Sequence, residues 1–120
     1  MNKYLMSGEG WRLGYSPDAE VFVGLVGAEN WAIELTEQEL TDFYRLSLQL
    51  IETMAAMQAE LADEEKLTCS AQTTNISIEA SGFADSFTIH LQLLNGRRGE
   101  GIWTSRAIAE ILRTLVQIYP

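Results

Sequence analysis

The stretch RRGEGIW, residues 97–103, carries the side chains best suited to binding chemistry in an otherwise acidic chain. Arg97 and Arg98 are adjacent cations that can donate hydrogen bonds to an anionic group, and Glu100 is close enough in sequence to orient them. Trp103 adds a flat ring on which a base or an aromatic partner can stack. These four residues are therefore our candidates for an anion-binding or partner-binding site.

A purely structural interpretation of this stretch competes with the functional one. Glycines at 96, 99 and 101 allow positive φ and a sharp bend. The arginines would then lie in solvent or pair with the chain's own carboxylates, and Trp103 would belong to the core. We favour this interpretation because loop charges are usually solvated. If the protein binds an anionic group, we still expect it here, since the N-terminal amides of a following helix attract anions.

Residues that perform catalysis or hold metals do not gather in the sequence. His90 is the one histidine, and no acid or nucleophile with the spacing of a catalytic set accompanies it. Cys69 is the one cysteine, and it reads as an inert core thiol. An acidic cluster without calcium-loop spacing reads as a solvated helix end; it comprises Glu60, Asp63, Glu64 and Glu65. We therefore predict no catalytic residue, no cofactor, no metal site and no enzyme.

The charge of the chain is strongly negative but unevenly distributed. The formal net charge is −9, and residues 90–120 hold four of the 8 basic side chains but only two of the 17 acidic ones. A phosphate backbone is repelled by most of such a surface, so a polyanion would have to bind the C-terminal quarter. The single cysteine and the lack of a long apolar run or secretory signal predict a cytoplasmic protein outside the membrane.

The first half of the chain predicts strands followed by a long helix. Apolar residues alternate or run together in three short segments, and Trp11 and Trp31 fall at inward positions, where we expect large core anchors. Thr36 and Glu39 have the spacing of a capping box, and a stripe of apolar residues at intervals of three and four follows them. The predicted strands are residues 11–15, 21–26 and 31–35, and the predicted helix is residues 37–62.

This helix is too long for the sheet that precedes it. It would measure about 40 Å, whereas a six-residue strand covers about 20 Å. The apolar residues of its second half, Met54, Met57 and Leu61, must then find another partner, which is either another helix of the same chain or a second subunit. We predict a homodimer whose interface includes one of these three side chains.

The second half repeats the pattern of strands and then a helix. Apolar alternation predicts strands at residues 66–71, 74–80, 86–94 and 101–103, and Thr104 or Ser105 can cap a last helix. The fold class is therefore α+β, with two strand-rich units each followed by a helix, and antiparallel sheets packed on a long central helix and a C-terminal helix. We expect one domain, residues 1–120, with an internal pseudo-repeat of about 8–63 and 66–119.

Four segments of the sequence resemble a small cyanobacterial family catalogued as domain of unknown function 1818: GEGWRLGYSP, LVGAENWAIELTEQEL, ADEEKLTCSAQTTNISIEASG and RRGEGIWTS. The resemblance covers nearly the whole chain and carries over no catalytic residue. That family resembles the Whirly-type single-stranded-DNA-binding transcriptional regulator fold. This likeness implies two strand-rich units, each followed by a helix, long helices that pack across a dimer, and DNA held on basic, aromatic sheet edges.

Two functions from different classes follow from these observations. The first is a non-catalytic interaction or regulatory protein of unknown specific role, with an unknown protein partner. It would present a polar sheet face made of Arg12, Glu34, Asn75, Ser77, Glu79, Thr88, His90 and Gln92. The alternative is a single-stranded nucleic-acid-binding, transcriptional-regulator-like protein. The acidic net charge disfavours nucleic acid as the partner.

Overall fold

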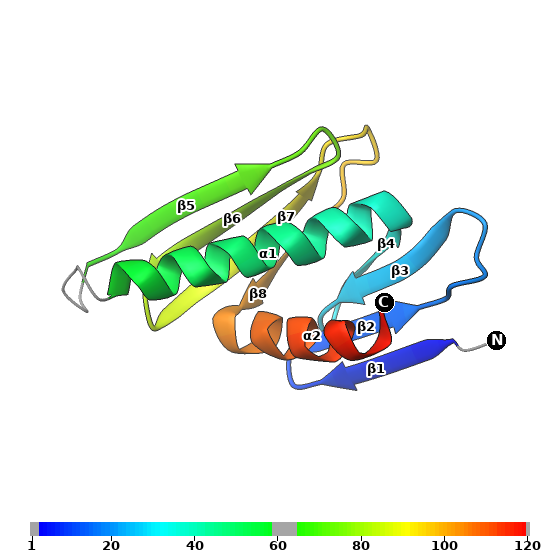
Figure 1. Cartoon of the computed structure of the whole chain (residues 1–120), viewed down its shortest axis with the longest axis horizontal. Helices are drawn as coiled ribbons and strands as arrows, with labels where there is room; N and C mark the ends of the chain where they lie inside the picture. Colours follow the sequence, from blue (N-terminus) through cyan, green and yellow to red (C-terminus); the bar gives the residue numbers. More distant parts are fainter. Residues whose placement is uncertain (1–2, 59–64, 120) are drawn as a thin grey trace.

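The computed structural model of the protein describes residues 3–58 and 65–119 and has an α+β architecture. Two four-stranded antiparallel sheets pack with two helices, and each sheet is followed in sequence by one of the helices (Figure 1). The first unit is β1 Tyr4–Gly8, β2 Trp11–Tyr15, β3 Phe22–Gly27, β4 Ala32–Thr36 and α1 Glu37–Gln58. The second unit is β5 Leu67–Gln72, β6 Ile76–Phe83, β7 Ser86–Leu93, β8 Glu100–Thr104 and α2 Ser105–Ile118.

Each sheet is a meander whose strands pair in chain order, and alternation decides which face is buried. In the first sheet Leu13 lies opposite Val26, and both are completely buried. In the second sheet Ile78 lies opposite Leu91, and these two are also completely buried. The predicted inward faces of the central strands are therefore confirmed.

Strand β1 is absent from the sequence prediction. It pairs with β2 so that Gly8 lies opposite Trp11, and the turn that joins the two strands contains Gly10, which has a φ of 81°. Its pattern carries little signal because Leu5 is 75 % exposed and Met6 is 41 % exposed. Without alternating burial, periodicity cannot mark an edge strand, and only the pairing with β2 reveals it.

Helix α1 begins with the capping box that the sequence predicts. The Glu39 amide donates to the Thr36 hydroxyl at 3.2 Å, and the Thr36 amide donates to the Glu39 carboxylate at 2.8 Å. These reciprocal bonds satisfy amides that have no partner inside the helix. The structure describes α1 as far as Gln58, and residues 59–62 of the predicted helix lie outside the described residues.

The second half of α1 packs against the other unit rather than against its own sheet. Helix α1 as a whole contacts β5 and β6 of the second sheet as well as β3 and β4 of the first, and Figure 1 shows its second half beside β5 and β6. Met54 is completely buried there, within the chain. The excess length of α1 is therefore covered intramolecularly, which removes Met54 from the predicted dimer interface. Met57 is half-buried, and Leu61 lies outside the described residues.

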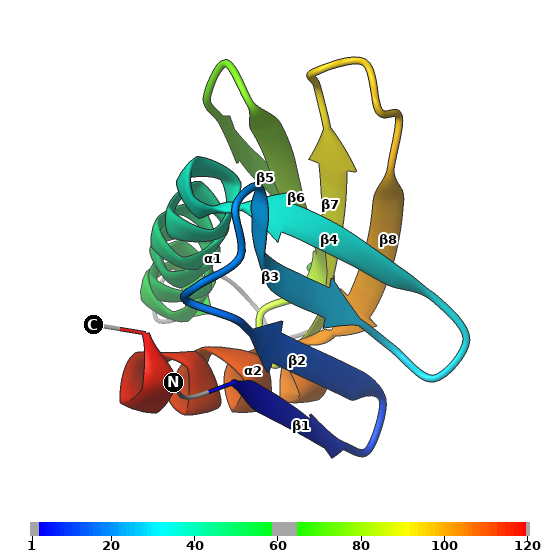
Figure 2. The same cartoon turned by 90° about the vertical axis from the view of Figure 1, so that its right-hand side faces the viewer.

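Helix α2, which belongs to the second unit, packs in turn against the first unit. Thr104 caps it by accepting a hydrogen bond from the Ala107 amide at 3.1 Å, as the sequence predicts. Its apolar side buries Ile108, Ile111 and Leu115 against strands of both sheets, chiefly β2, β7 and β8. Both helices lie on the same side of the molecule, and Figure 2 shows β8 on the side away from α1.

Candidate functional site

The structure separates the two adjacent arginines, which the sequence offers together as candidates for binding an anion or a partner. Arg97 turns inward and pairs with the carboxylate of Glu39, which is 1 % exposed. It also donates to the Glu34 carbonyl at 2.7 Å, and its guanidinium lies 4.7 Å from the centre of the Phe22 ring. Arg97 therefore ties the loop between β7 and β8 to the first unit through these contacts.

The carboxylates that receive these contacts are held in their charged form. Burial raises the pKa of Glu39, but hydrogen bonds from the Thr36 amide, Arg97 and Asn95 outweigh it, and the net pKa is lowered. Asp42 is 2 % exposed and behaves in the same way. Burial raises the pKa of Asp42, but hydrogen bonds from the second unit and from Gln38 outweigh this effect, and the net pKa is lowered. Charged acids at the start of α1 therefore join the two units.

Arg98 points away from this network. It has a φ of 58°, which places a non-glycine residue in the left-handed region, and Gly96, two residues earlier in the same loop, has a φ of 90°. Gly99 and Gly101 do not adopt positive φ, so the expected role of these two glycines in the bend is wrong. Arg98 is exposed and makes no ion pair with residues 3–58 or 65–119. Of the two arginines, it is the one whose charge is available.

Trp103 belongs to the core and not to a binding surface. It is 2 % exposed, and its ring nitrogen donates to the Gly27 carbonyl at 2.8 Å across the two units. The Trp31 ring packs 4.8 Å from it. A Cβ atom on Gly101 would lie 2.2 Å from the Trp31 ring, so glycine is required at 101 for close packing.

Trp31 is half-buried, whereas the sequence predicts that it is largely buried. Strand β4 begins one residue later, so Trp31 stands at the turn, and its ring wedges against β8. Trp11 is 7 % exposed, as predicted, and its ring nitrogen donates to the Glu110 carboxylate at 2.6 Å. Alternation therefore predicts the burial of Trp11, which lies within β2, but it fails for Trp31, which lies just before β4.

The predicted polar face divides between two sheets. Arg12 and Glu34 belong to the first sheet, and Arg12 donates to the carbonyls of Ala28 and Trp31. Asn75 lies in the turn before β6 and donates to Asp42 at 3.2 Å. The other five predicted residues do share the outer face of β6 and β7; they are Ser77, Glu79, Thr88, His90 and Gln92.

Glu100 lies on that outer face and orients a histidine rather than the arginines. Its carboxylate is 2.8 Å from His90 Nε2. Along the same row, Glu79 lies opposite His90 and His90 lies opposite Ile102. Ile102 is 52 % exposed, an unusual position for a large aliphatic side chain among polar neighbours.

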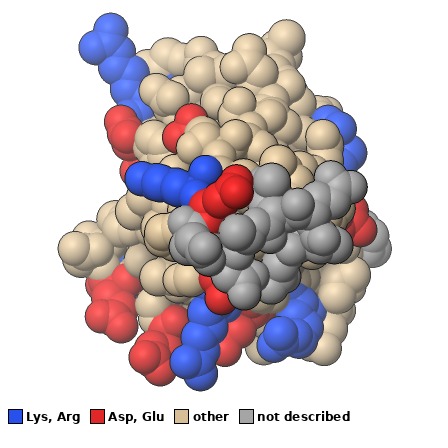
Figure 3. Space-filling view, turned by 90° about the vertical axis from the view of Figure 1, so that its left-hand side faces the viewer, with Lys and Arg blue, Asp and Glu red and all other residues tan. Residues whose placement is uncertain are grey.

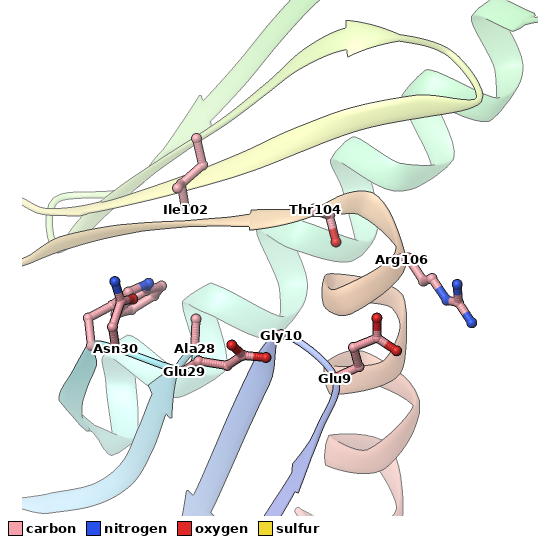
Figure 4. Close-up of a pocket in the computed structure, with 9 residues that line it drawn as sticks. Glu9, Gly10, Ala28, Glu29, Asn30, Ile102, Thr104 and Arg106 are labelled. Carbon is pink, nitrogen blue, oxygen red and sulfur yellow. The ribbon is translucent and has the colours of Figure 1, made fainter.

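Two hollows meet at Ile102, and we call the area around them the Ile102 surface. The first, of about 700 Å³, lies between β8 and two turns of the first sheet, and Trp31, Thr104 and Arg106 line it together with Glu9, Glu29 and Asn30. Figure 4 shows the Glu9 and Glu29 side chains reaching into this space. The second, of about 430 Å³, lies over the outer face of β6–β8, with Glu79, Thr88, His90 and Glu100 in its lining.

Charged side chains elsewhere are more evenly mixed. Figure 3 shows one end of the molecule, where basic side chains lie singly or beside acidic ones. Within residues 3–58 and 65–119 no three His, Cys, Asp or Glu side chains group together as metal ligands. Most of the acidic cluster near α1, namely Glu60, Asp63 and Glu64, lies outside the described residues. In the described part of the chain, neither helix has the length and apolar character needed to span a bilayer.

A family model for a domain of unknown function, DUF1818, matches residues 6–118. The chain belongs to this family. A solved structure from Prochlorococcus sp. NATL2A, described as a protein with unknown function from the DUF155 family, is similar over 94 % of this chain and 98 % of that chain. Its TM-score is 0.85 at 21 % sequence identity, so the likeness concerns the fold alone. No curated protein matches the sequence.

Sequence reasoning named four residues of the second hollow, Glu79, Thr88, His90 and Glu100, but it missed Ile102 and the grouping of residues around the first hollow. The one available signal was Ile102 itself, an isoleucine at an outward position between Glu100 and Thr104. Glu9 and Glu29 are 20 residues apart in sequence, and nothing local relates them to β8. They share the first hollow only because the two turns of the first sheet lie beside that strand.

Proposed function

We propose that the protein is a non-catalytic interaction protein that recognises its partner through the Ile102 surface. The carrying observation is the exposure of Ile102 between two hollows, since an exposed apolar group with a polar rim is typical of a recognition site. The half-buried Trp31 adds an aromatic group at the same place. Arg97 and Trp103 do not line either hollow.

The test compares two exposed aliphatic residues. Val21 is 57 % exposed and lies in the connection between β2 and β3, so Val21→Asp is a matched control for Ile102→Asp. Each tagged variant is used for affinity capture from the native cell extract, with mass spectrometry of protein and nucleic acid. Ile102→Asp should lose a partner that the wild type and Val21→Asp retain. Identical partners for all three proteins would contradict the proposal.

Single-stranded nucleic acid binding is the second candidate function. The resemblance to the Whirly-type fold favours it, and so does the first hollow, where Arg106 and Trp31 offer a cation and an aromatic ring. Its carboxylates repel phosphate, which is why we rank it second. A labelled oligothymidine that binds the protein, with affinity that falls steeply as salt rises, would favour this candidate.

We further propose that the protein is a homodimer, with the apolar groove between α1 and α2 in its interface instead of Met54. The groove is lined by Tyr44, Leu48, Leu112, Val116 and Tyr119. Val116 is 58 % exposed and Leu48 is 37 % exposed. The α1 wall carries Arg45 and Glu52, and the α2 wall carries Arg113, so a twofold arrangement that places Glu52 beside the α2 wall of the other copy pairs opposite charges.

Sedimentation of the wild type and of Val116→Asp tests this arrangement. The wild type should sediment as a dimer at micromolar concentration, and Val116→Asp should shift it to a monomer while Val21→Asp leaves it unchanged. A wild-type monomer at that concentration would rule the homodimer out.

A further inference from the structure

Strand β8 has an unused edge beside the first hollow. It ends the order β5-β6-β7-β8 and pairs with β7 on one side only. Within the described residues, no backbone hydrogen bond joins residues 100–104 to any other strand. Alternate backbone groups of such an edge point away from its neighbour and are free to pair with another extended segment.

The first sheet approaches this edge without pairing with it. Strand β4 contacts β8, but the Trp31 ring occupies the position against Gly101, next to Trp103. The ring therefore holds the two sheets apart as a spacer. The space that results is the first hollow, which Figure 4 shows between β8 and the turns that carry Glu9 and Glu29.

The charges around this edge favour a cationic occupant. Glu9 and Glu29 lie in the first hollow, and Glu79 and Glu100 lie in the second, on the other side of Ile102. Arg106 is the one Lys or Arg in the lining of the two hollows, and His90 in the second hollow contacts Glu100. Four carboxylates around one exposed strand attract Lys or Arg side chains and repel phosphate.

We infer that the edge of β8 binds an extended, Lys- or Arg-containing peptide segment as an additional strand. This inference rests on the proposed function and names the chemistry of the partner. Backbone hydrogen bonds to β8 supply affinity, and side chains that alternate along the added strand supply specificity. Apolar side chains of the segment lie beside Ile102, and the cationic side chains that alternate with them face Glu9 and Glu29 in the first hollow.

The experiment uses three synthetic eight-residue peptides. The first alternates Val and Lys, the second alternates Val and Glu, and the third is the Val-Lys peptide with N-methyl groups on the valine nitrogens. N-methylation removes hydrogen-bond donors and blocks strand pairing while it preserves charge. Binding is measured by fluorescence anisotropy, and the contact site is mapped by amide chemical shifts of Gly101, Ile102 and Thr104.

Two charge-reversal variants complete the design. Glu9→Lys with Glu29→Lys changes the first hollow, and Asp18→Lys with Glu20→Lys makes the same change in net charge at an exposed turn elsewhere. The Val-Lys peptide should bind the wild type and the second variant alike. We expect roughly tenfold weaker binding to the first variant, from the loss and reversal of two ion pairs. The N-methylated and Val-Glu peptides should bind at least as weakly as that.

Four results would overturn the inference. If the N-methylated peptide binds as tightly as the Val-Lys peptide, charge alone determines the affinity and no strand pairing occurs. If both charge-reversal variants bind the Val-Lys peptide equally weakly, the net charge of the protein determines the affinity and the first hollow is not the binding site. Absence of Val-Lys binding, while Ile102-dependent partner capture persists, would leave the proposed function intact and exclude a cationic strand. If oligothymidine shifts the same three amides and the peptide does not, the site belongs to nucleic acid instead.

Discussion

The β4–α1 and β8–α2 junctions share their local design but differ in their surroundings. In each, a threonine ends the strand and caps the helix through its hydroxyl, Thr36 in the first and Thr104 in the second. The first junction adds Glu39, which the loop before β8 covers with Asn95 and Arg97. The second has Ala107 at the corresponding position, and the strand before it remains open. The same junction thus serves once to join the units and once to border a surface.

The largest effect should come from the closed junction. Glu39→Ala removes the acceptor of Arg97 and Asn95 and the reciprocal half of the capping box. We expect a loss of about 3 kcal/mol in the free energy of unfolding, because three partly buried donors lose their acceptor. Urea unfolding followed by circular dichroism measures it. Ile102→Asp at the open junction should change the same quantity by less than about 0.5 kcal/mol; similar losses at the two positions would refute the contrast.

The spacer between the sheets should give the next largest effect. Gly101→Val pushes a side chain into the position of the Trp31 ring, and overpacking of this kind costs about 2 kcal/mol. Trp31→Ala alone should also destabilise the protein. The double variant should be less destabilised than the sum of the single variants, because each change relieves the other. Strict additivity in a double-mutant cycle would mean that the ring does not press on residue 101.

The stability effects of the adjacent Arg97 and Arg98 should also differ, although both effects are smaller than those above. Arg97→Ala should lower the free energy of unfolding by about 1.5 kcal/mol, since it leaves the buried Glu39 carboxylate without its cation. Arg98→Ala should change it by less than about 0.5 kcal/mol, as is usual for a solvated surface side chain. Thermal or urea unfolding of the two variants, measured side by side, checks this. Equal losses would mean that Arg98 also has an internal role.

The smallest effect concerns pH. Burial raises the pKa of Glu39, the hydrogen bonds outweigh it, and the net lowering means that the unfolded chain binds protons first. The stabilising contribution is therefore complete above the unfolded-state pKa and is lost as pH falls from there through the lower folded-state pKa. Glu39→Gln should flatten this part of the profile of unfolding midpoint against pH. An unchanged slope would mean that Glu39 does not titrate differently in the folded protein.

Much of the fold was predictable because its signals are local. Helix caps depend on residues three apart, as for Thr36 with Glu39 and for Thr104 with Ala107. Inward faces depend on alternation, which correctly placed residues such as Ile78 and Leu91. Strand β1 escaped because an exposed edge strand has no such alternation.

The candidate site was only partly predictable, since charge in a sequence does not reveal its partner. Arg97 and Arg98 are equivalent by type and position, but one meets Glu39, 58 residues earlier in the chain, and the other meets none within the described residues. Met54 is a similar case. The apolar stripe correctly required a partner for it, but could not tell a second subunit from strands β5 and β6 of the same chain.

The amino-acid sequence by itself determined the α+β class, the two strand-and-helix units, the caps and the buried faces, because backbone propensity and side-chain period act over a few residues. The tertiary structure alone decided that α1 packs across both units and that Trp31 wedges against Gly101. It alone decided that Ile102 stays exposed beside Glu9 and Glu29. These outcomes depend on contacts between residues far apart in the chain, whose geometry exists only when both sheets have formed.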